Sequence, residues 1–243
     1  MKHCELTLRT PEENLACDEA LLDFCEESYE GANAEGVLRF WEPAQYFVVL
    51  GYANPVATEV NLPFCQQQTI PVLRRCTGGG TVLQGPGCLN YSLLLPIHSA
   101  GALQSIPGTN DFVLEKHQAA LSALLRARVE KQGHTDLSIG GLKFSGNAQR
   151  RRKHFLLFHG SFLLHLDVAL IEKALPSPSR QPDYRLGRSH TDFLVNVKAP
   201  AHTIKAALMN AWGASEQLTG IPFSRISLLA ETKYALDEWN FKF

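Results

Sequence analysis

Apolar side chains recur at helical spacing in four parts of the chain. Residues 11–28 begin with a proline and two glutamates, residue types that favour a helix N-terminus. Residues 111–131 carry the clearest amphipathic pattern, for which Asp111 is the expected N-cap. Shorter helices are predicted over 167–175 and 202–214. These segments predict a small set of helices, each with one face toward a core.

Strand-like segments, rich in β-branched and aromatic residues or alternating in polarity, outnumber the helices. Residues 37–42 and 46–52, separated by a turn at Pro43, are expected to form a hairpin with Arg39 and Trp41 on one face. Further strands are predicted over 5–10, 69–75, 81–84, 89–96, 136–139, 140–149 and 153–167. Because strands mostly follow one another directly, the predicted class is α+β, with mixed, largely antiparallel β-sheets and covering helices. A doubly wound fold would need regular strand-helix alternation.

Composition narrows the class of protein. A chain of 243 residues with 45% hydrophobic and 19% charged residues can bury one good-sized core. Its net charge of -1 argues against a protein built to hold nucleic acid, so the basic run from Arg150 to Lys153 is expected to be a solvated turn. No apolar run is long enough to suggest a membrane span, and six scattered cysteines suit reduced thiols. We therefore expect a cytoplasmic protein that binds neither nucleic acid nor membrane.

The stretch RRCTGGGTVLQ at 74–84 contains the most unusual local pattern. It has neither the lysine of a P-loop nor a following helix, so a Walker A or dinucleotide-binding turn is excluded. Three glycines still expose successive backbone N–H groups, and Arg75 adds a guanidinium suited to phosphate or carboxylate. A glycine-rich hairpin turn with solvated arginines explains this triplet about as well.

Lys143 is the second candidate for ligand binding. It lies in a strand-like run between Gly140–Gly141 and Ser145–Gly146–Asn147, where a ligand can approach the backbone closely. Its ammonium would stabilise negative charge on a phosphate or carbonyl oxygen. Considered without the rest of the chain, an ordinary exposed strand lysine is the simpler interpretation.

Several ordered motifs carry a family resemblance: RRCTGGGTV, GPGCLNYSLLL, TDLSIGGLKFSGNAQ and HFLLFHGSFLLHLD. With NLACDEALL and LRFWEPAQYFVVLGYANP before them, they closely resemble the lipoate-protein ligase A and octanoyltransferase superfamily, which shares its catalytic domain with biotin protein ligases. The resemblance covers roughly residues 5–200. It implies the biotin/lipoate ligase catalytic-domain fold for 1–200, with 201–243 as a short C-terminal helical extension of the same domain.

The resemblance also implies roles for individual residues. Lys143 matches the family lysine that contacts the activated acyl carbonyl and the α-phosphate, and Asp136 matches an acidic residue near the nucleotide. His159 matches the second histidine of an H-H-G motif whose first position is Phe158 here, a departure from the family pattern. The other implied substrate- or ATP-binding residues are Arg75, Gly78, Gly79, Gly80, Thr81, Val82, Leu83, Ser145, Gly146, Asn147 and Ala148. No metal-ligating residue is assigned.

The activity implied is that of a lipoate-protein ligase. Such an enzyme uses ATP, with Mg²⁺ expected, to convert lipoate or octanoate to an acyl-adenylate. It then transfers the acyl group to a lysine of a lipoyl-acceptor domain, such as glycine cleavage H protein or a 2-oxoacid dehydrogenase acyltransferase subunit. Because few residues follow the catalytic core, three forms stay open: a short complete ligase, a ligase that needs a separate accessory subunit, and a transferase that takes preformed lipoyl-adenylate.

Cysteine positions bear on the alternatives. Octanoyltransferases and amidotransferases of the superfamily use an acyl-cysteine in place of ATP, but no cysteine follows Cys88 in this chain. Cys76 and Cys88 are expected to be packed thiols and not nucleophiles. The sequence therefore favours adenylate chemistry over an ATP-independent transferase. A non-catalytic acyl- or nucleotide-binding relative is the third alternative, supported by the short C-terminal part and the Phe158 departure.

Overall fold

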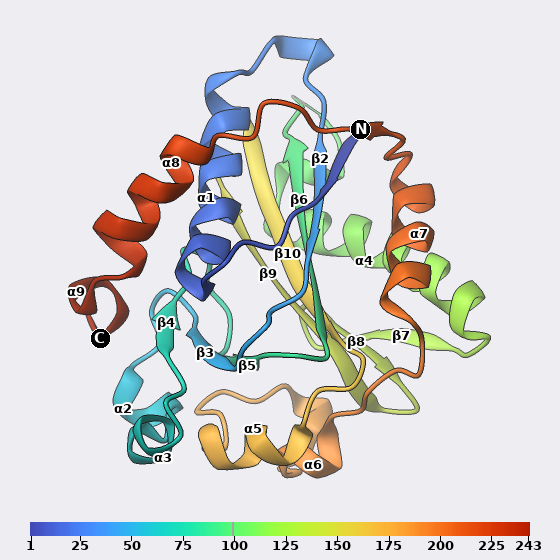
Figure 1. The fold of residues 1–243 in the computed structure, drawn as a ribbon. Helices are drawn as coiled ribbons and strands as arrows, with labels where there is room; N and C mark the ends of the chain where they lie inside the picture. The colour runs from blue at the N-terminus through green and yellow to red at the C-terminus, as the bar shows by residue number, and fades with distance from the viewer. Residues whose placement is uncertain (99) are drawn as a thin grey trace.

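A computed structural model describes residues 1–98 and 100–243, and in this part of the chain the strands form two sheets (Figure 1). The larger sheet has the strand order β11-β1-β2-β6-β10-β9-β8-β7, and the smaller has the order β4-β3-β5. Strand β1 pairs in parallel with β2 and β11, and β3 pairs in parallel with β4. The other named pairs are antiparallel. The predicted α+β class with mixed, largely antiparallel sheets is confirmed.

The strand bounds agree with most of the predicted segments. They are Lys2–Glu5 (β1), Val37–Trp41 (β2), Phe47–Leu50 (β3), Val72–Arg74 (β4), Val82–Gln84 (β5), Cys88–Pro96 (β6), Val129–Gln132 (β7), Asp136–Ile139 (β8), Leu142–Arg151 (β9), Phe155–Leu163 (β10) and Glu216–Gln217 (β11).

The helices include several short turns that the apolar pattern did not indicate. The α-helices are Pro11–Glu27 (α1), Val56–Glu59 (α2), Leu62–Gln67 (α3), Ile106–Leu125 (α4), Val168–Ala174 (α5), His190–Phe193 (α6), Ala201–Trp212 (α7), Phe223–Leu229 (α8) and Asp237–Asn240 (α9). Short 3₁₀ turns cover Gly31–Asn33 (η1), Ala102–Gln104 (η2) and Asp183–Arg185 (η3), and a π-helical turn covers Ala230–Tyr234 (η4).

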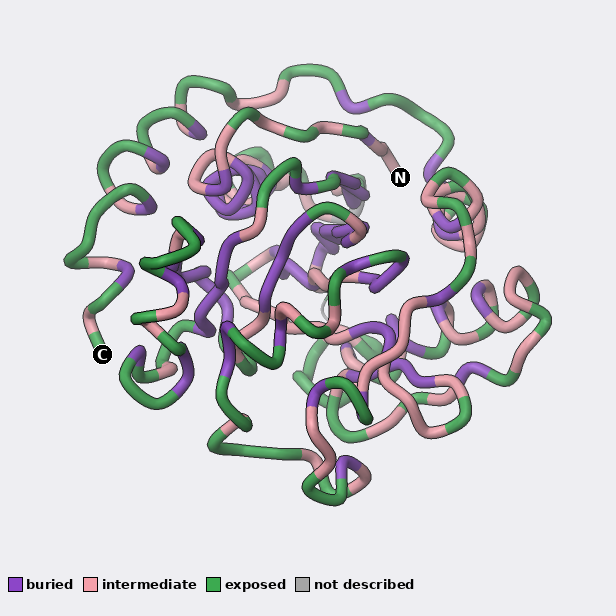
Figure 2. The backbone as a smooth tube through the Cα atoms, turned by 60° about the horizontal axis from the view of Figure 1, so that its bottom comes forward, coloured by how far each residue is buried: buried purple, intermediate pink, exposed green. Residues whose placement is uncertain are grey.

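Helices cover both faces of the larger sheet (Figure 1). On one face α1 and α8 enclose a cluster that includes Leu21 and Ile226, and on the other α4 and α7 enclose a cluster that includes Leu121 and Leu208. Figure 2 shows the buried positions gathered in the central strands and along α1. Burial of these apolar side chains is the main force that holds the layers together. Among the described residues, no helix combines the length and apolar character needed to cross a bilayer.

The longest predicted helix was wrong at both ends. Helix α4 begins at Ile106, where the Ser105 hydroxyl accepts a hydrogen bond from the Gly108 N–H, so Asp111 is not the N-cap. The helix ends before Arg126, which has a φ of 49°. The chain then enters strand β7. The predicted helix extended into this strand because the apolar pattern alone does not show the left-handed turn at Arg126.

The predicted hairpin of 37–42 and 46–52 was also wrong. Strand β2 pairs with β1 and β6, whereas β3 lies in the smaller sheet with β4 and β5. Every residue of both strands is buried, and such strands do not show which neighbour they pair with. Arg39 and Trp41 do share a face, because the guanidinium carbon of Arg39 lies 5.2 Å from the centre of the Trp41 ring.

The basic run at 150–153 is only in part the solvated turn that we expected, because Arg152 and Lys153 are exposed in the turn after β9 whereas the first two arginines are not. Arg150 and Arg151 belong to strand β9, and the Arg150 guanidinium donates to the Cys76 carbonyl at 3.0 Å. Arg152 forms an ion pair with Asp23 at 2.6 Å. These arginines tie the sheet to α1 and to the segment before the glycines.

Candidate active site

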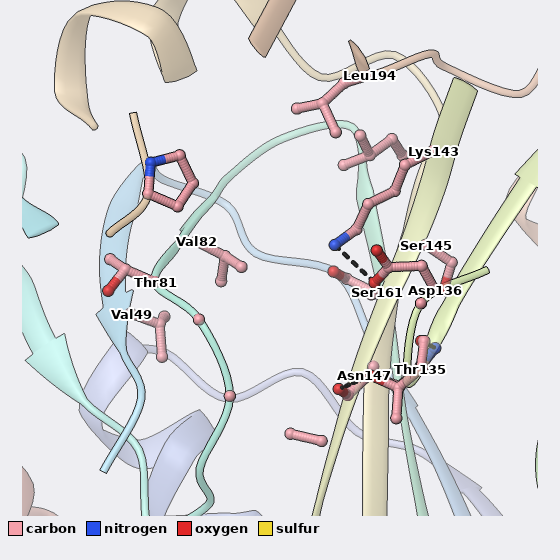
Figure 3. A pocket seen from close by; sticks show the side chains of 18 of the residues that line it. Val49, Thr81, Val82, Thr135, Asp136, Lys143, Ser145, Asn147, Ser161 and Leu194 are labelled. Atoms are coloured by element: carbon pink, nitrogen blue, oxygen red, sulfur yellow. Dashed lines mark hydrogen bonds and ion pairs between the residues drawn. The ribbon is translucent and has the colours of Figure 1, made fainter. Parts of the chain in front are cut away.

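One cavity of about 860 Å³ lies between the larger sheet, the glycine-rich loop and the segment 178–194 (Figure 3). Apart from Gly78, every residue proposed for the site from the sequence lines it: Arg75, Gly79, Gly80, Thr81, Val82, Leu83, Asp136, Lys143, Ser145, Gly146, Asn147, Ala148 and His159. Figure 3 shows Thr81 and Val82 on one side and Lys143 and Asp136 on the other. The fold therefore brings two distant parts of the sequence to opposite walls of one cavity.

Strand register explains the floor of the cavity. Asp136 pairs with Gly146, Gly146 with Ser161, Ser161 with Asn90, and Asn90 with Trp41. Directly paired residues point to the same face of a sheet, so these residues form one row along the cavity floor. Crossing from β8 to β2, the row covers on the order of 19 Å, given the usual spacing between strands. The row runs from the carboxylate of Asp136 at one end to Trp41 at the other.

Lys143, Asp136 and Tyr184 form what we call the lysine wall. The Lys143 amine lies 2.8 Å from Asp136 Oδ1, and the Tyr184 hydroxyl donates to Asp136 Oδ2 at 2.8 Å. Burial, followed by the charge of Asp136, raises the pKa of Tyr184, which keeps this phenol a hydrogen-bond donor. Gly146 leaves room for the lysine, because a Cβ there would lie 2.9 Å from Lys143 Nζ. The amine is held in one place by an ion pair, unlike that of a free surface lysine.

The Asn147 side chain is held by two hydrogen bonds in a space that a second glycine, Gly160, leaves open. Its side-chain oxygen accepts from the Tyr91 hydroxyl at 2.5 Å, and its Nδ2 donates to the Thr135 carbonyl at 2.6 Å. A Cβ on Gly160 would lie 1.8 Å from Asn147 Oδ1. The glycine of the HGS motif therefore makes space for the asparagine of the SGNA motif on the neighbouring strand.

Residues 75–83, the glycine-loop wall, show why three glycines occur together. Gly79 has a φ of +87°, which a residue with a side chain rarely adopts. A Cβ on Gly78 or Gly80 would meet nothing within 4 Å, so these two glycines leave open space that no neighbouring protein atom fills. One glycine therefore makes the turn. Gly80 keeps the cavity surface free of side chains, whereas Gly78 lies outside the lining.

Arg75 organises this loop from within. Its guanidinium donates to the carbonyls of Gly78 at 2.6 Å and Gly80 at 2.7 Å, and its Nε donates to Thr77 Oγ1 at 2.9 Å. The expectation that its donors are free for a ligand was therefore incomplete. Burial lowers the pKa of Arg75 to about 10, which still leaves it charged at neutral pH. Among the described residues, no carboxylate forms an ion pair with it.

Arg74, the preceding residue, has a different role. Its guanidinium donates to the carbonyls of Gly51 at 2.9 Å, Asn54 at 2.8 Å and Asn240 at 2.9 Å. Its backbone N–H donates to Asn240 Oδ1 at 2.9 Å. Arg74 thus fastens the C-terminal helix α9 to the strand that enters the glycine loop, and it is wholly buried away from the cavity.

A buried hydrogen-bond chain joins the sheet to the glycine loop. Asp18 on α1 binds the Arg39 guanidinium at 2.6 Å and His159 Nδ1 at 2.8 Å, and His159 Nε2 lies 2.8 Å from Thr77 Oγ1. Burial tends to raise the pKa of Asp18, but the hydrogen bond from His159 and the charge of Arg39 outweigh it and hold the pKa below its usual range. Both ring nitrogens of His159 are therefore occupied by protein groups. This histidine positions the loop.

Asp18, Arg39, Thr77 and Tyr184 were not among the site residues proposed from the sequence. A signal for the first two existed: one carboxylate on an apolar face of a helix, and one arginine inside an apolar strand. Charges at such positions are stable only when they are paired. Phe158, the departure from the family motif, is fully buried in the cluster under α4 and α7, on the face opposite His159. An aromatic side chain suits that position.

The six cysteines are unpaired and buried. Burial raises the pKa of Cys76 to about 11, with the nearby charge of Glu19 as a further cause, and it raises the pKa of Cys88 to about 12. No cysteine is among the residues that line the cavity in the described part of the chain. Both thiols are packed in the interior, as predicted, and buried thiols with a raised pKa are poor nucleophiles.

A cavity with an apolar lining and a few convergent polar groups is typical of a binding site for a small molecule. Residues 10–206 match the family described as lipoyl protein ligase A/B catalytic domain, and the chain belongs to this family. The family resemblance that we identified from the sequence is confirmed.

Relatives named octanoyltransferase and relatives named lipoate-protein ligase both match nearly the whole chain. An octanoyltransferase LipM from Lysinibacillus sphaericus is 28% identical over 274 residues, covering 96% of this chain and 95% of the relative. A bi-partite lipoate protein ligase from Thermoplasma acidophilum, whose structural study includes its E2 lipoyl domain, has a TM-score of 0.82 at 25% identity, covering 99% and 96%. A lipoate-protein ligase A solved with ATP bound has a TM-score of 0.79 at 25% identity and covers 99% of both chains. The fold is that of lipoate ligases.

Proposed function

We propose that this protein is a lipoate-protein ligase. It uses ATP to activate lipoate or octanoate as an acyl-adenylate, and it transfers the acyl group to the lysine amine of a lipoyl-acceptor domain. The proposal rests mainly on one observation: the cavity offers cationic and backbone donors for a phosphate but no cysteine among the described residues that line it. An acyl-cysteine route has no nucleophile there.

The residues of the two walls suit this chemistry. Lys143, fixed by Asp136, would donate to the α-phosphate when the acyl carboxylate attacks it and displaces pyrophosphate. It would donate to the acyl carbonyl oxygen when the acceptor amine attacks and displaces AMP. The open surface at Gly80 would admit the anhydride against backbone N–H groups. The apolar acyl chain would lie along the floor, among Leu15, Trp41 and Leu83. Arg75 would act indirectly, by holding the loop in shape.

ATP would enter with Mg²⁺, which shields the phosphate charges. Asp136 is the carboxylate beside Lys143, and its oxygens keep lone pairs beyond those used by Lys143 and Tyr184. It is the residue that would contribute to holding the cation, with the phosphates supplying further oxygens. The proposal that ATP binds is supported by the resemblance to a lipoate-protein ligase A structure with bound ATP.

The second candidate is an octanoyltransferase that takes its acyl group from a carrier protein. The similarity to an octanoyltransferase LipM along nearly the whole chain favours it. Residues 89–243 contain no cysteine, however, and the cysteines before them are buried. This reaction would need a nucleophile other than a cavity thiol.

The C-terminal part belongs, in our proposal, to the same domain as residues 1–200. Ile204 and Leu208 of α7 lie in the core cluster with α4, and Asn240 of α9 binds Arg74. The acceptor is proposed to be a lipoyl domain such as that of glycine cleavage H protein or a 2-oxoacid dehydrogenase acyltransferase. The bi-partite organisation of the Thermoplasma ligase makes a separate accessory subunit a further proposal to test.

An acceptor-modification assay distinguishes these functions. A lipoyl domain is incubated with the protein and one of three donors: lipoate with ATP and Mg²⁺, preformed lipoyl-adenylate, or octanoyl-acyl carrier protein. Intact mass reports acylation of the acceptor lysine. We expect modification with the first two donors. Modification with the carrier protein alone would overturn the ligase proposal, and modification with adenylate alone would indicate a missing accessory subunit.

A further inference from the structure

Two arginines that form no ion pair with a carboxylate of the described residues lie together beside the cavity. The guanidinium carbons of Arg185 and Arg188 lie 4.9 and 5.2 Å from the centre of the Phe193 ring. Each side chain donates through Nε to the other residue's carbonyl, at 2.9 and 3.0 Å. Two like charges are thus held close by backbone carbonyls and one aromatic ring.

Arg185 lines the cavity and is only 4% exposed. Its Nη2 is buried, and among the described residues it has no hydrogen-bond partner. A buried N–H group without a partner costs free energy, more so when it is charged. A ligand that accepts a hydrogen bond would remove this cost.

The nearby acids do not bind the two guanidinium groups directly. Asp183, in the same turn, also lines the cavity, and Glu172 accepts a hydrogen bond from the His190 backbone at 2.7 Å. In the described part of the chain neither acid lies within 4.0 Å of an arginine nitrogen of this pair. Arginine stays charged in proteins, so the guanidinium groups keep their charge without a direct ion pair, although burial lowers the pKa of Arg185 and the charge of Glu172 acts on it against that effect.

The turn that joins the two arginines is conformationally demanding. Leu186 has a φ of 54°, which is rare for a branched side chain, and Gly187 follows with a φ of 69°. The Leu186 side chain is 84% exposed, so burial of this residue does not compensate for its conformation. Strain of this kind is found where function requires a particular geometry. Here the geometry brings the second guanidinium back to the first.

The pair is connected to the lysine wall. The Arg188 Nη2 donates to the Gly141 carbonyl at 3.2 Å, two residues before Lys143, and Tyr184 donates to Asp136. The Val195 N–H donates to the Lys143 carbonyl at 2.9 Å. The arginines and Lys143 therefore belong to one hydrogen-bonded assembly at the same side of the cavity.

We propose that Arg185 binds a phosphate oxygen of the nucleotide and that Arg188 is a positioning residue that holds Arg185 in place. This inference rests on the proposed ATP-dependent function. The carboxylate of the acyl substrate is a weaker match, because it carries a single charge and the proposed function already places the acyl end at Lys143. A polyphosphate offers several charged oxygens in the geometry that an arginine fork recognises.

Equilibrium binding to the full chain tests this inference. Isothermal titration measures the affinity for ATP with Mg²⁺, for inorganic pyrophosphate and for lipoate, in the wild type and in Arg185→Met, Arg185→Lys and Arg188→Met. Arg128→Met is the matched control, because that side chain is 88% exposed and pairs with Glu130. Thermal unfolding of each variant shows whether the fold is kept.

We expect Arg185→Met to weaken ATP and pyrophosphate binding about 10- to 100-fold, as loss of a charge-assisted hydrogen bond implies, with lipoate binding unchanged. Arg185→Lys should recover part of the loss, and Arg188→Met should show a smaller one. Unchanged ATP affinity in Arg185→Met and Arg188→Met would overturn the inference while leaving the ligase proposal standing. An equal loss of lipoate binding would assign Arg185 to the carboxylate or to loop structure, and would also overturn it. A wild type that binds neither ATP nor pyrophosphate would overturn both.

Discussion

The two walls of the cavity hold their cations in opposite ways. On the lysine wall the Lys143 ammonium is paired with Asp136, which Tyr184 also contacts. On the glycine-loop wall Arg75 is bound by backbone carbonyls and carries no ion pair among the described residues. A paired amine is a positioned donor, whereas a guanidinium surrounded by carbonyls fixes the shape of a loop. In our proposal the same charge therefore serves ligand contact on one wall and loop structure on the other.

Removing Lys143 is expected to have the largest effect on activity. Lys143→Ala should lower acyl transfer to a lipoyl domain by about 10²- to 10³-fold, the usual cost of removing one donor that stabilises developing charge. Thermal stability should also fall, since the Asp136 side chain is only 11% exposed and loses its ion-pair partner. Steady-state transfer rates and a melting curve check both parts. Full activity in the variant would show that the lysine wall does not take part in the chemistry.

Replacing Arg75 tests the other wall. Arg75→Met should lower the free energy of unfolding by roughly 1.5–3 kcal/mol, because the Gly78 and Gly80 carbonyls lose hydrogen bonds to a charged group. It should also weaken ligand binding, because the glycine loop loses the side chain that holds its shape. Denaturant unfolding and lipoate titration measure these effects.

Arg74→Met is the matched control for that variant. It removes a buried arginine that binds α9 and the 51–54 segment and does not line the cavity. We expect it to destabilise the fold but to preserve lipoate affinity in the molecules that stay folded. If both variants lose stability and affinity in the same proportion, the two adjacent arginines do not have separate roles.

Gly146→Ala should have an intermediate effect confined to the lysine wall. The added Cβ would lie 2.9 Å from Lys143 Nζ and 3.0 Å from its Cε, so the flexible side chain moves and the strand need not. We expect about a tenfold loss of transfer rate, within the range for displaced catalytic groups, with an unchanged melting temperature. Gly160→Ala is the contrasting variant, because its Cβ would meet Asn147 Oδ1 and the Gly146 carbonyl and should destabilise the fold.

The smallest predicted effect is on substrate selection at the Trp41 end of the cavity floor. Trp41 Nε1 and Asn90 Nδ2 are buried there without partners in the described part of the chain. Lipoate carries sulfur, a weak acceptor, where octanoate carries only carbon and hydrogen. We expect Asn90→Leu to shift the ratio of kcat/KM values a few-fold toward octanoate, since one buried donor is removed. A competition assay with both acids measures the ratio, and no shift would show that this end does not select the chain.

The sequence predicted the fold class and most strands because their apolar patterns are local. Most of the cavity-lining residues could also be predicted, because Arg75, the glycines and Lys143 occur in recognisable motifs. It did not predict the partners of β2 and β3, because strands buried on both faces lack an alternating pattern. The hydrogen bonds that link Asp18 through His159 to Thr77 were also not predicted. Its members lie on α1, β10 and the glycine loop, and only the tertiary fold brings them together.

The most direct test of the account is detection of the activated intermediate without an acceptor. The protein is incubated with lipoate, ATP and Mg²⁺, and in a parallel reaction with octanoyl-acyl carrier protein. Mass spectrometry then examines the small molecules and the intact chain, for the wild type and for a Cys76→Ser, Cys88→Ser double variant. We predict acyl-adenylate in the first reaction, an unmodified protein mass in both, and the same result for the double variant. An acylated protein formed from the carrier, with no adenylate formed from ATP, would contradict the account.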